Sequence, residues 1–185
     1  MKKILIGLVA VLAIVFVSLI GIYNNLVSGR ENVSAGWAQV ENVLQRRADL
    51  IPNLVNTVKG YAGHEKSVFE EVTKARSAWT NAAAQDDKVK AASAMDSAIS
   101  RLLMVAENYP VLKADSTFLK LQDELAGTEN RIAVERMRYN QAVRNYNVML
   151  KSFPSNIIAG MFGFNQFSEY FKAEEKAKTV PEVKF

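Results

Sequence analysis

One histidine, His64, is the first candidate for metal or acid–base chemistry, and Glu65 follows it directly. A di-iron bundle needs two Glu-x-x-His pairs, and a zinc protease helix needs His-Glu-x-x-His. Lys66 and Ser67 come next, so neither motif is present. The sequence also has no cysteine and no glycine-rich phosphate loop. We therefore expect no metal, no cofactor and no catalytic residue, and we expect His64 to be a solvated or capping residue, with pH sensing as the alternative.

Two charged residues, Arg47 and Glu135, occupy positions where the helical pattern calls for an apolar side chain. If both face the interior of a bundle they have to pair, because an unpaired buried charge is strongly destabilising. Such a pair would form a polar layer that fixes the register of the helices. A local stutter in the repeat, which turns one or both side chains to solvent, is the alternative. A catalytic role is the third.

Pro52 and two Tyr-Asn pairs are the remaining candidates for structural or binding roles. Pro52 lies inside a predicted helix, where it leaves the Ala48 carbonyl without its partner and should bend the chain. A hinge or docking site formed with Asn53 is the alternative. The pairs that begin at Tyr139 and Tyr146 are seven residues apart, so they share one helix face. They indicate either buried rings with hydroxyls at a wet edge or a partner-binding strip.

These residues lie on long predicted helices. Between Val33 and Tyr61, apolar or aromatic residues fill eight of nine positions at alternating four- and three-residue steps, which is the pattern of a bundle seam. Gly60 and Gly63 predict a break after it. The periodicity predicts four helices: about 24–59, one through 68–82, one from 86 to just before Tyr109, and about 115–151. Short connections make neighbours antiparallel, so the predicted fold is all-α, an up-down-up-down four-helix bundle with two long and two shorter helices.

An uncharged apolar run from Ile4 to Ile22 precedes this body and follows Lys2 and Lys3. Its 19 residues rise roughly 28 Å as a helix, which nearly matches a bilayer's hydrocarbon core. We expect an uncleaved membrane anchor that contacts lipid through residues 4–22. A cleaved signal peptide and a soluble helix are the alternatives. The two lysines favour a cytoplasmic N-terminus and an extracytoplasmic body.

The composition after the anchor argues against nucleic acid as a partner. From Tyr23 onward there are 21 basic and 19 acidic residues, a net charge of 21 − 19 = +2. Nucleic-acid binding normally needs a strongly basic face. We expect three parts: the anchor at 1–23, the helical bundle at 24–152, and a C-terminal segment at 153–185.

The C-terminal segment is unusually aromatic, with six aromatic residues between positions 153 and 171. Phe162, Phe164 and Phe167 are candidates for interaction. The segment either packs on its own bundle, lies at the membrane surface as an interfacial helix, or contacts a neighbouring subunit. The charged tail, residues 172–185, is expected to be flexible, with Phe185 as a residue that could dock in a groove.

Helix lengths predict an uncovered apolar surface on the body. Two helices of about 20 residues cannot cover two of about 36 along their full length, so the membrane-proximal half of the long pair is left bare. A bare apolar surface of that extent usually marks a partner. We expect either the aromatic segment or a second copy of the chain to cover it.

Several motifs together resemble one known family, the LemA family of bacterial membrane proteins. The most specific is the block at 44–54, Leu-Gln-Arg-Arg-Ala-Asp-Leu-Ile-Pro-Asn-Leu. It is accompanied by the motifs at 23–24, 61–65, 107–110, 128–130, 139–140, 146–147 and 153–154. The resemblance implies a single N-terminal membrane helix, an antiparallel helical body and a place in the bacterial inner membrane. It also implies association with membrane proteases or other envelope proteins, and it carries no catalytic residue.

The sequence therefore predicts a membrane-anchored helical scaffold or adaptor that binds envelope proteins as a homo-oligomer, with no catalytic activity. A lipid-binding or membrane-shaping protein that acts through the aromatic segment is the first alternative. An enzyme of unrecognised type is the second.

Overall fold

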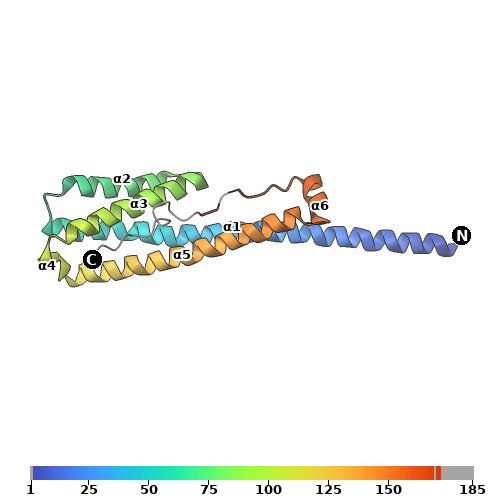
Figure 1. The fold of residues 1–185 in the computed structure, drawn as a ribbon, viewed down its shortest axis with the longest axis horizontal. Helices are drawn as coiled ribbons and strands as arrows, with labels where there is room; N and C mark the ends of the chain where they lie inside the picture. Colours follow the sequence, from blue (N-terminus) through green and yellow to red (C-terminus); the bar gives the residue numbers. More distant parts are fainter. Residues whose placement is uncertain (1, 169, 172–185) are drawn as a thin grey trace, which may run out of the picture. The chain divides into compact units, whose positions relative to one another are not determined.

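The computed structural model describes residues 2–168 and 170–171. Within these residues the chain is helical and contains no strand, which confirms the all-α prediction. Figure 1 labels the helices, which are α1 (Lys2–Tyr61), α2 (Lys66–Asn81), α3 (Gln85–Ala106), α4 (Pro110–Lys113), α5 (Ser116–Lys151) and α6 (Ser155–Phe162). The charged tail at 172–185 lies outside the described residues. The up-down-up-down bundle stays a prediction.

The contacts divide the chain into two units, and each is described here by itself. Unit 1 comprises residues 1–38 and 135–185, and unit 2 comprises residues 39–134. Both boundaries fall inside helices, α1 and α5.

Helix α1 runs without interruption from the apolar run at residues 4–22 to the end of the seam between Val33 and Tyr61. The predicted anchor and the first body helix are therefore one helix. No residue in the most apolar stretch of this run is buried within the protein, and the helix is long and apolar enough to cross a membrane. Pro52 lies inside α1 without ending it. The predicted break is confirmed, because the helix ends at Tyr61, between Gly60 and Gly63.

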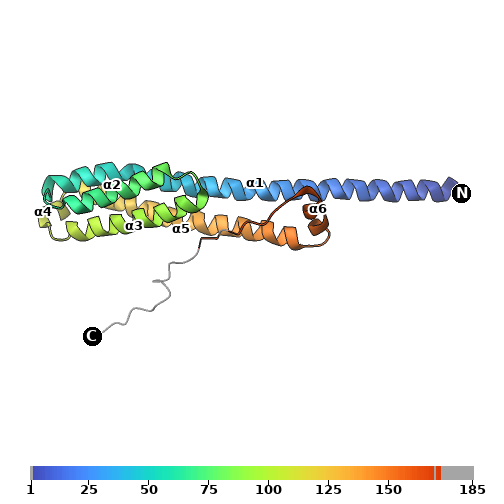
Figure 2. The ribbon, with the colours of Figure 1, turned by 90° about the horizontal axis from the view of Figure 1, so that it is seen from above.

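Unit 2 packs α2, α3 and α4 with the adjoining parts of α1 and α5. Figures 1 and 2 both show α2 and α3 side by side. The buried core takes its largest residues from all of these helices, namely Leu44, Ile51, Leu54, Trp79, Met95, Ile99, Leu102, Leu112, Phe118 and Ile132. Helix α3 ends at Ala106, before Tyr109 as predicted, whereas α4 was not predicted. Pro110 at the start of α4 has the fixed φ that favours a first helical turn.

Asp115 begins α5 as its N-cap. Its Oδ1 accepts hydrogen bonds from the backbone N–H of Thr117 and Phe118, at 2.9 and 2.8 Å. The Tyr61 hydroxyl donates to Oδ2 at 3.1 Å. The bond from Phe118 is the main reason that the pKa of Asp115 lies below its ordinary value. The hydrogen bond to Asp115 in turn raises the pKa of Tyr61.

Unit 1 contains the first part of α1, the last part of α5, α6 and the segment that follows α6. Gly163 ends α6 in the left-handed conformation, with φ of 71°, which a glycine adopts without strain. We call residues 164–171 the strap; its described residues are not helical, and Figure 1 draws them as an extended trace after α6. Residue 169 of the strap lies outside the described residues.

Candidate functional site

Two tyrosines of α5 fill hollows that glycines leave in α1. Tyr146 lies against Gly29, where an added Cβ would be 3.1 Å from the tyrosine Cδ2. Tyr139 lies against Gly36 in the same way, with its Cα 3.5 Å from an added Cβ. The contact on α1 moves forward by seven residues, from Gly29 to Gly36, while the contact on α5 moves back by seven, from Tyr146 to Tyr139. The two helices therefore run antiparallel in this unit. Both rings are 1% exposed, which confirms the prediction of buried rings.

The predicted wet edge is wrong for Tyr146. Its hydroxyl is buried and has no hydrogen-bond partner among the described residues. This burial raises the pKa of Tyr146, although the Arg30 guanidinium has the opposite effect. The side chain acts as packing rather than as a polar contact.

Two asparagines of α5 hold the strap by its backbone. The Asn147 amide donates to the Phe167 carbonyl at 2.7 Å, and its Oδ1 accepts from the Phe167 N–H at 3.1 Å. Asn140 does the same with Phe171, at 2.9 Å for both bonds. Asn147 also donates to the Tyr170 hydroxyl at 3.2 Å. Each side-chain amide therefore pairs with the main chain as the backbone of a neighbouring strand would.

The same strap residues place aromatic rings on the two tyrosines. Phe167 meets Tyr146 edge-on, with ring centroids 5.5 Å apart, and Phe171 meets Tyr139 edge-on at 5.6 Å. Phe171 also stacks on Trp37 at 5.8 Å. Edge-on and offset arrangements are the favoured geometries for aromatic pairs. We call this surface, made by Trp37, Tyr139, Asn140, Tyr146 and Asn147, the strap groove.

The spacing explains why the contact occurs twice. Seven helical residues separate Asn140 from Asn147 and rise about 10 Å. Four residues separate Phe167 from Phe171, and an extended chain of that length advances up to about 13 Å. A strap that is slightly shorter than fully extended therefore spans the same distance as the seven helical residues. The chain's own C-terminal segment thus occupies the predicted partner strip.

Phe164 and Phe162 continue this packing toward the apolar run. The Tyr23 ring lies edge-on to both, at 5.6 Å from Phe164 and 5.0 Å from Phe162. Of the three predicted placements of the aromatic segment, packing on its own unit is therefore observed for Phe164 and Phe167. Phe162 is still 60% exposed.

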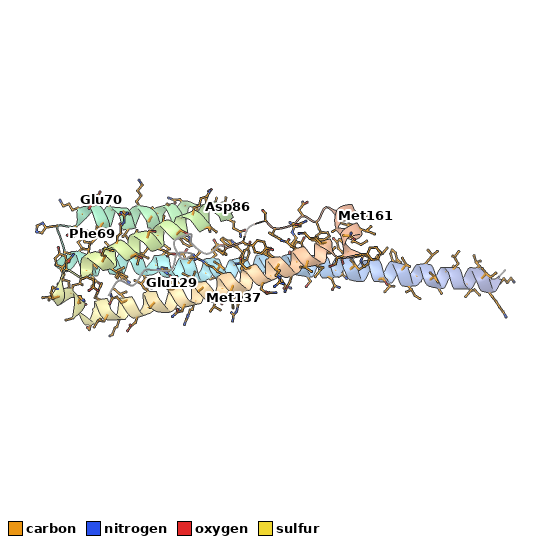
Figure 3. All side chains as sticks on the ribbon, viewed as in Figure 1. Phe69, Glu70, Asp86, Glu129, Met137 and Met161 are labelled. Carbon is orange, nitrogen blue, oxygen red and sulfur yellow. The ribbon has the colours of Figure 1, made fainter. Side chains whose placement is uncertain are left out.

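In unit 2, the predicted partner of Arg47 is wrong. Arg47 is 7% exposed, and its Nε lies 3.2 Å from Asp96 Oδ1 on α3. It also pairs with Glu129 of α5, which is labelled in Figure 3. Glu135 lies six residues beyond Glu129, a rise of about 9 Å, and pairs with Arg138 at 2.7 Å. Arg47 is therefore a buried charge that is paired, but it joins three helices through two carboxylates, and the Glu129 side chain is 51% exposed.

Pro52 also has a role that links helices within unit 2. Because proline has no N–H, the Ala48 carbonyl lacks its helical donor. Arg76 of α2 donates to that carbonyl from Nε at 3.0 Å. Pro52 therefore exposes an acceptor at which α2 docks, and Asn53, predicted to take part, instead accepts from the Thr57 hydroxyl through its backbone at 2.8 Å.

The remaining candidates form no reactive cluster in the described part of the chain. His64 lies exposed in the turn between α1 and α2. Among residues 2–168 and 170–171, no three His, Cys, Asp or Glu side chains are placed to hold a metal ion.

The packing role of Gly29 and Gly36 and the binding role of Asn140 and Asn147 were not predicted from the sequence. Their shared seven-residue spacing was the available signal. The sequence pattern assigned no role to the two glycines, and it placed the two asparagines only within the Tyr-Asn motif.

A protein-family model described as the LemA family matches residues 36–185. The chain belongs to the LemA family. Magnetosome protein MamQ 2 of Paramagnetospirillum magneticum is 27% identical over 183 aligned residues, which cover 85% of this chain and 67% of that protein. MamQ of Magnetospirillum gryphiswaldense is 26% identical over 183 aligned residues, which again cover 85% of this chain and 67% of that protein. Protein LemA of Metamycoplasma hominis is 23% identical over 141 residues, 76% of this chain and 64% of that protein.

Proposed function

We propose that this LemA-family chain is a membrane-anchored helical adaptor that binds extended segments of other envelope proteins. The observation that carries the proposal is the paired hydrogen bonding of Asn140 and Asn147 with the strap backbone. An amide that both donates to and accepts from one residue recognises main chain whatever the side chain is. This is the chemistry by which an exposed sheet edge binds an extended peptide.

The aromatic floor of the strap groove defines the partner segment. Tyr146 receives one ring, and Tyr139 with Trp37 receives another four residues further along. A partner therefore carries aromatic residues at positions i and i+4 of an extended segment. A second copy of this chain carries such a segment, so exchange of straps between copies is the route to the homo-oligomer.

The apolar run of α1 supplies the anchor. Residues 4–22 are uncharged, and none of them is buried within the protein. We place the N-terminus, with Lys2 and Lys3, in the cytoplasm and the helical body outside the inner membrane. The names LemA and MamQ describe no catalysed reaction, which supports a non-catalytic role.

Photo-crosslinking in native membranes tests this function. A photoreactive residue replaces Arg144, which is exposed on α5, four positions after Asn140 and three before Asn147. We expect covalent products with envelope proteins or with a second copy, joined through a segment with aromatic residues four apart. The control places the same photoreactive residue at Lys120, which is exposed on α5 within unit 2.

Two results would contradict the adaptor function. One is that position 144 crosslinks only to the strap of its own chain. The other is that positions 144 and 120 yield the same products, since the groove would then select nothing.

A further inference from the structure

An apolar pocket lies between α1 and α6, within unit 1. Its volume is about 520 Å³, which falls in the range of small-molecule sites. One wall is formed by residues of the apolar run and the other by α6, mainly Phe16, Leu19, Ile20, Ile157, Met161 and Phe162. Apart from Tyr23, every lining residue is apolar. Figures 1 and 2 both show α6 beside α1.

The pocket opens outward, because its rim is exposed. Phe16 is 63% exposed, and Met161, labelled on α6 in Figure 3, is 73% exposed. A contiguous apolar surface of this kind usually marks a binding site or a membrane contact. The sequence agrees, because residues 152–168 include no charged side chain.

The position of the pocket along α1 decides between these two contacts. Phe16, Leu19 and Ile20 belong to the uncharged run that ends at Ile22. Tyr23 follows it and is held edge-on by Phe162. Tyrosine is enriched where a membrane meets water, with its ring apolar and its hydroxyl wet. When residues 4–22 are inserted in a bilayer, Tyr23 is placed at the membrane–water boundary and the pocket walls from Phe16 to Ile20 lie on its hydrocarbon side.

We propose that this pocket binds an acyl chain of a membrane phospholipid, with α6 lying at the membrane surface. The proposal rests on insertion of residues 4–22 in the bilayer, which is part of the proposed function. The medium around Phe16 and Ile20 is then hydrocarbon. An apolar pocket does not hold ordered water, which needs polar partners, so an acyl chain is the ligand that its lining fits.

A photoreactive lipid tests the proposal on the full-length chain. The protein is reconstituted in phosphatidylcholine vesicles that contain a phosphatidylcholine with a diazirine in one acyl chain. After irradiation, labelled residues are mapped by mass spectrometry. We expect label on Met161 and Phe162 of α6 as well as on residues 4–12 of α1. Label on α6 is expressed relative to label on residues 4–12.

A matched pair of variants separates the pocket from simple immersion in lipid. Leu19→Trp fills the pocket and should abolish most of the α6 label. Leu12→Trp makes the same change in the apolar run away from the pocket lining and should leave the α6 label unchanged. Amide exchange at Phe167 checks that the strap, and so unit 1, is folded in both variants.

Each contrary result has a distinct meaning. Label on residues 4–12 with none on α6 overturns the acyl-chain site and leaves the anchor standing. Equal α6 label in the two tryptophan variants also overturns the site, because α6 would then contact lipid without a pocket. Absence of label from residues 4–12 contradicts both the site and the proposed anchor.

Discussion

Replacing Asn147 by alanine is the sharpest perturbation of the strap groove. The change removes both hydrogen bonds with the Phe167 backbone and the bond to the Tyr170 hydroxyl. It leaves the α5 backbone intact, because alanine favours helix more than asparagine does. The expected effect is therefore on the attachment of the strap and not on the helices.

The magnitude follows from the bonds that are lost. One intramolecular hydrogen bond contributes about 0.5–1.5 kcal/mol net, and the strap can regain water as a partner when it opens. Losing the two backbone bonds should lower the free energy of strap opening by about 1–3 kcal/mol. Exchange of the Phe167 amide hydrogen, which occurs from the open state, should then accelerate roughly 5- to 150-fold.

Hydrogen exchange of the full-length chain in lipid nanodiscs measures this, with fragmentation that resolves the Phe167 amide. The matched control is Asn145→Ala, which removes an exposed asparagine of α5 that accepts from Gln141 at 2.7 Å. Its Phe167 exchange should equal that of the unchanged chain. If the Phe167 amide hydrogen exchanges at the same rate in Asn147→Ala and Asn145→Ala, Asn147 does not hold the strap and the reasoning is refuted.

Three further predictions concern other parts of the chain. Arg76→Met should lower the free energy of unfolding by about 1–3 kcal/mol, because the Ala48 carbonyl loses its donor; in a Pro52→Ala background the loss should be smaller, because the N–H at position 52 takes its place. The Asp115 carboxyl has a folded-state pKa below its ordinary value, so its contribution to stability is present at neutral pH and lost as the pH falls below about 4; Asp115→Asn keeps a capping acceptor and should flatten this acid dependence in thermal unfolding. Gly29→Leu should destabilise unit 1, because an added Cβ already meets Tyr146 at 3.1 Å, whereas Gly21→Leu, with nothing within 4 Å, should be tolerated when unfolding is followed by near-ultraviolet circular dichroism.

Each of these has a result that would count against it. Additive effects of Arg76→Met and Pro52→Ala would show that the two residues do not share the Ala48 carbonyl. An unchanged acid profile in Asp115→Asn would remove Asp115 as a source of acid sensitivity. Equal losses from the two glycine variants would mean that Gly29 has no special packing role.

The helices were largely predictable, because their signals are local. The uncharged run and the seam from Val33 to Tyr61 predicted the two parts of α1, and the end of the third helix was correctly predicted before Tyr109. The partners of Arg47 were not predictable in this way. Asp96 lies on α3, and its distance from Arg47 depends on how three helices pack, which the periodicity of one helix does not contain.

The candidate site was predictable only in part. The Tyr-Asn repeat pointed to one face of α5, but the function of each asparagine depends on a non-helical segment 20 and 31 residues further along the chain. No local pattern specifies which residue of that segment meets Asn147. The Ala48 carbonyl was correctly expected to lack its helical donor at Pro52, yet its donor, Arg76, comes from another helix.

The central claim is that the strap groove recognises an extended segment with aromatic residues four apart. The most direct test is binding of a fluorescent peptide with the sequence of residues 164–171, measured by anisotropy on full-length protein in nanodiscs. A chain with Phe167→Ala and Phe171→Ala frees its own groove, and should bind the peptide saturably and more tightly than the unchanged chain. Adding Asn147→Leu should weaken that binding by at least about 5-fold. Absence of binding to the freed groove, or equal binding after Asn147→Leu, would contradict the account.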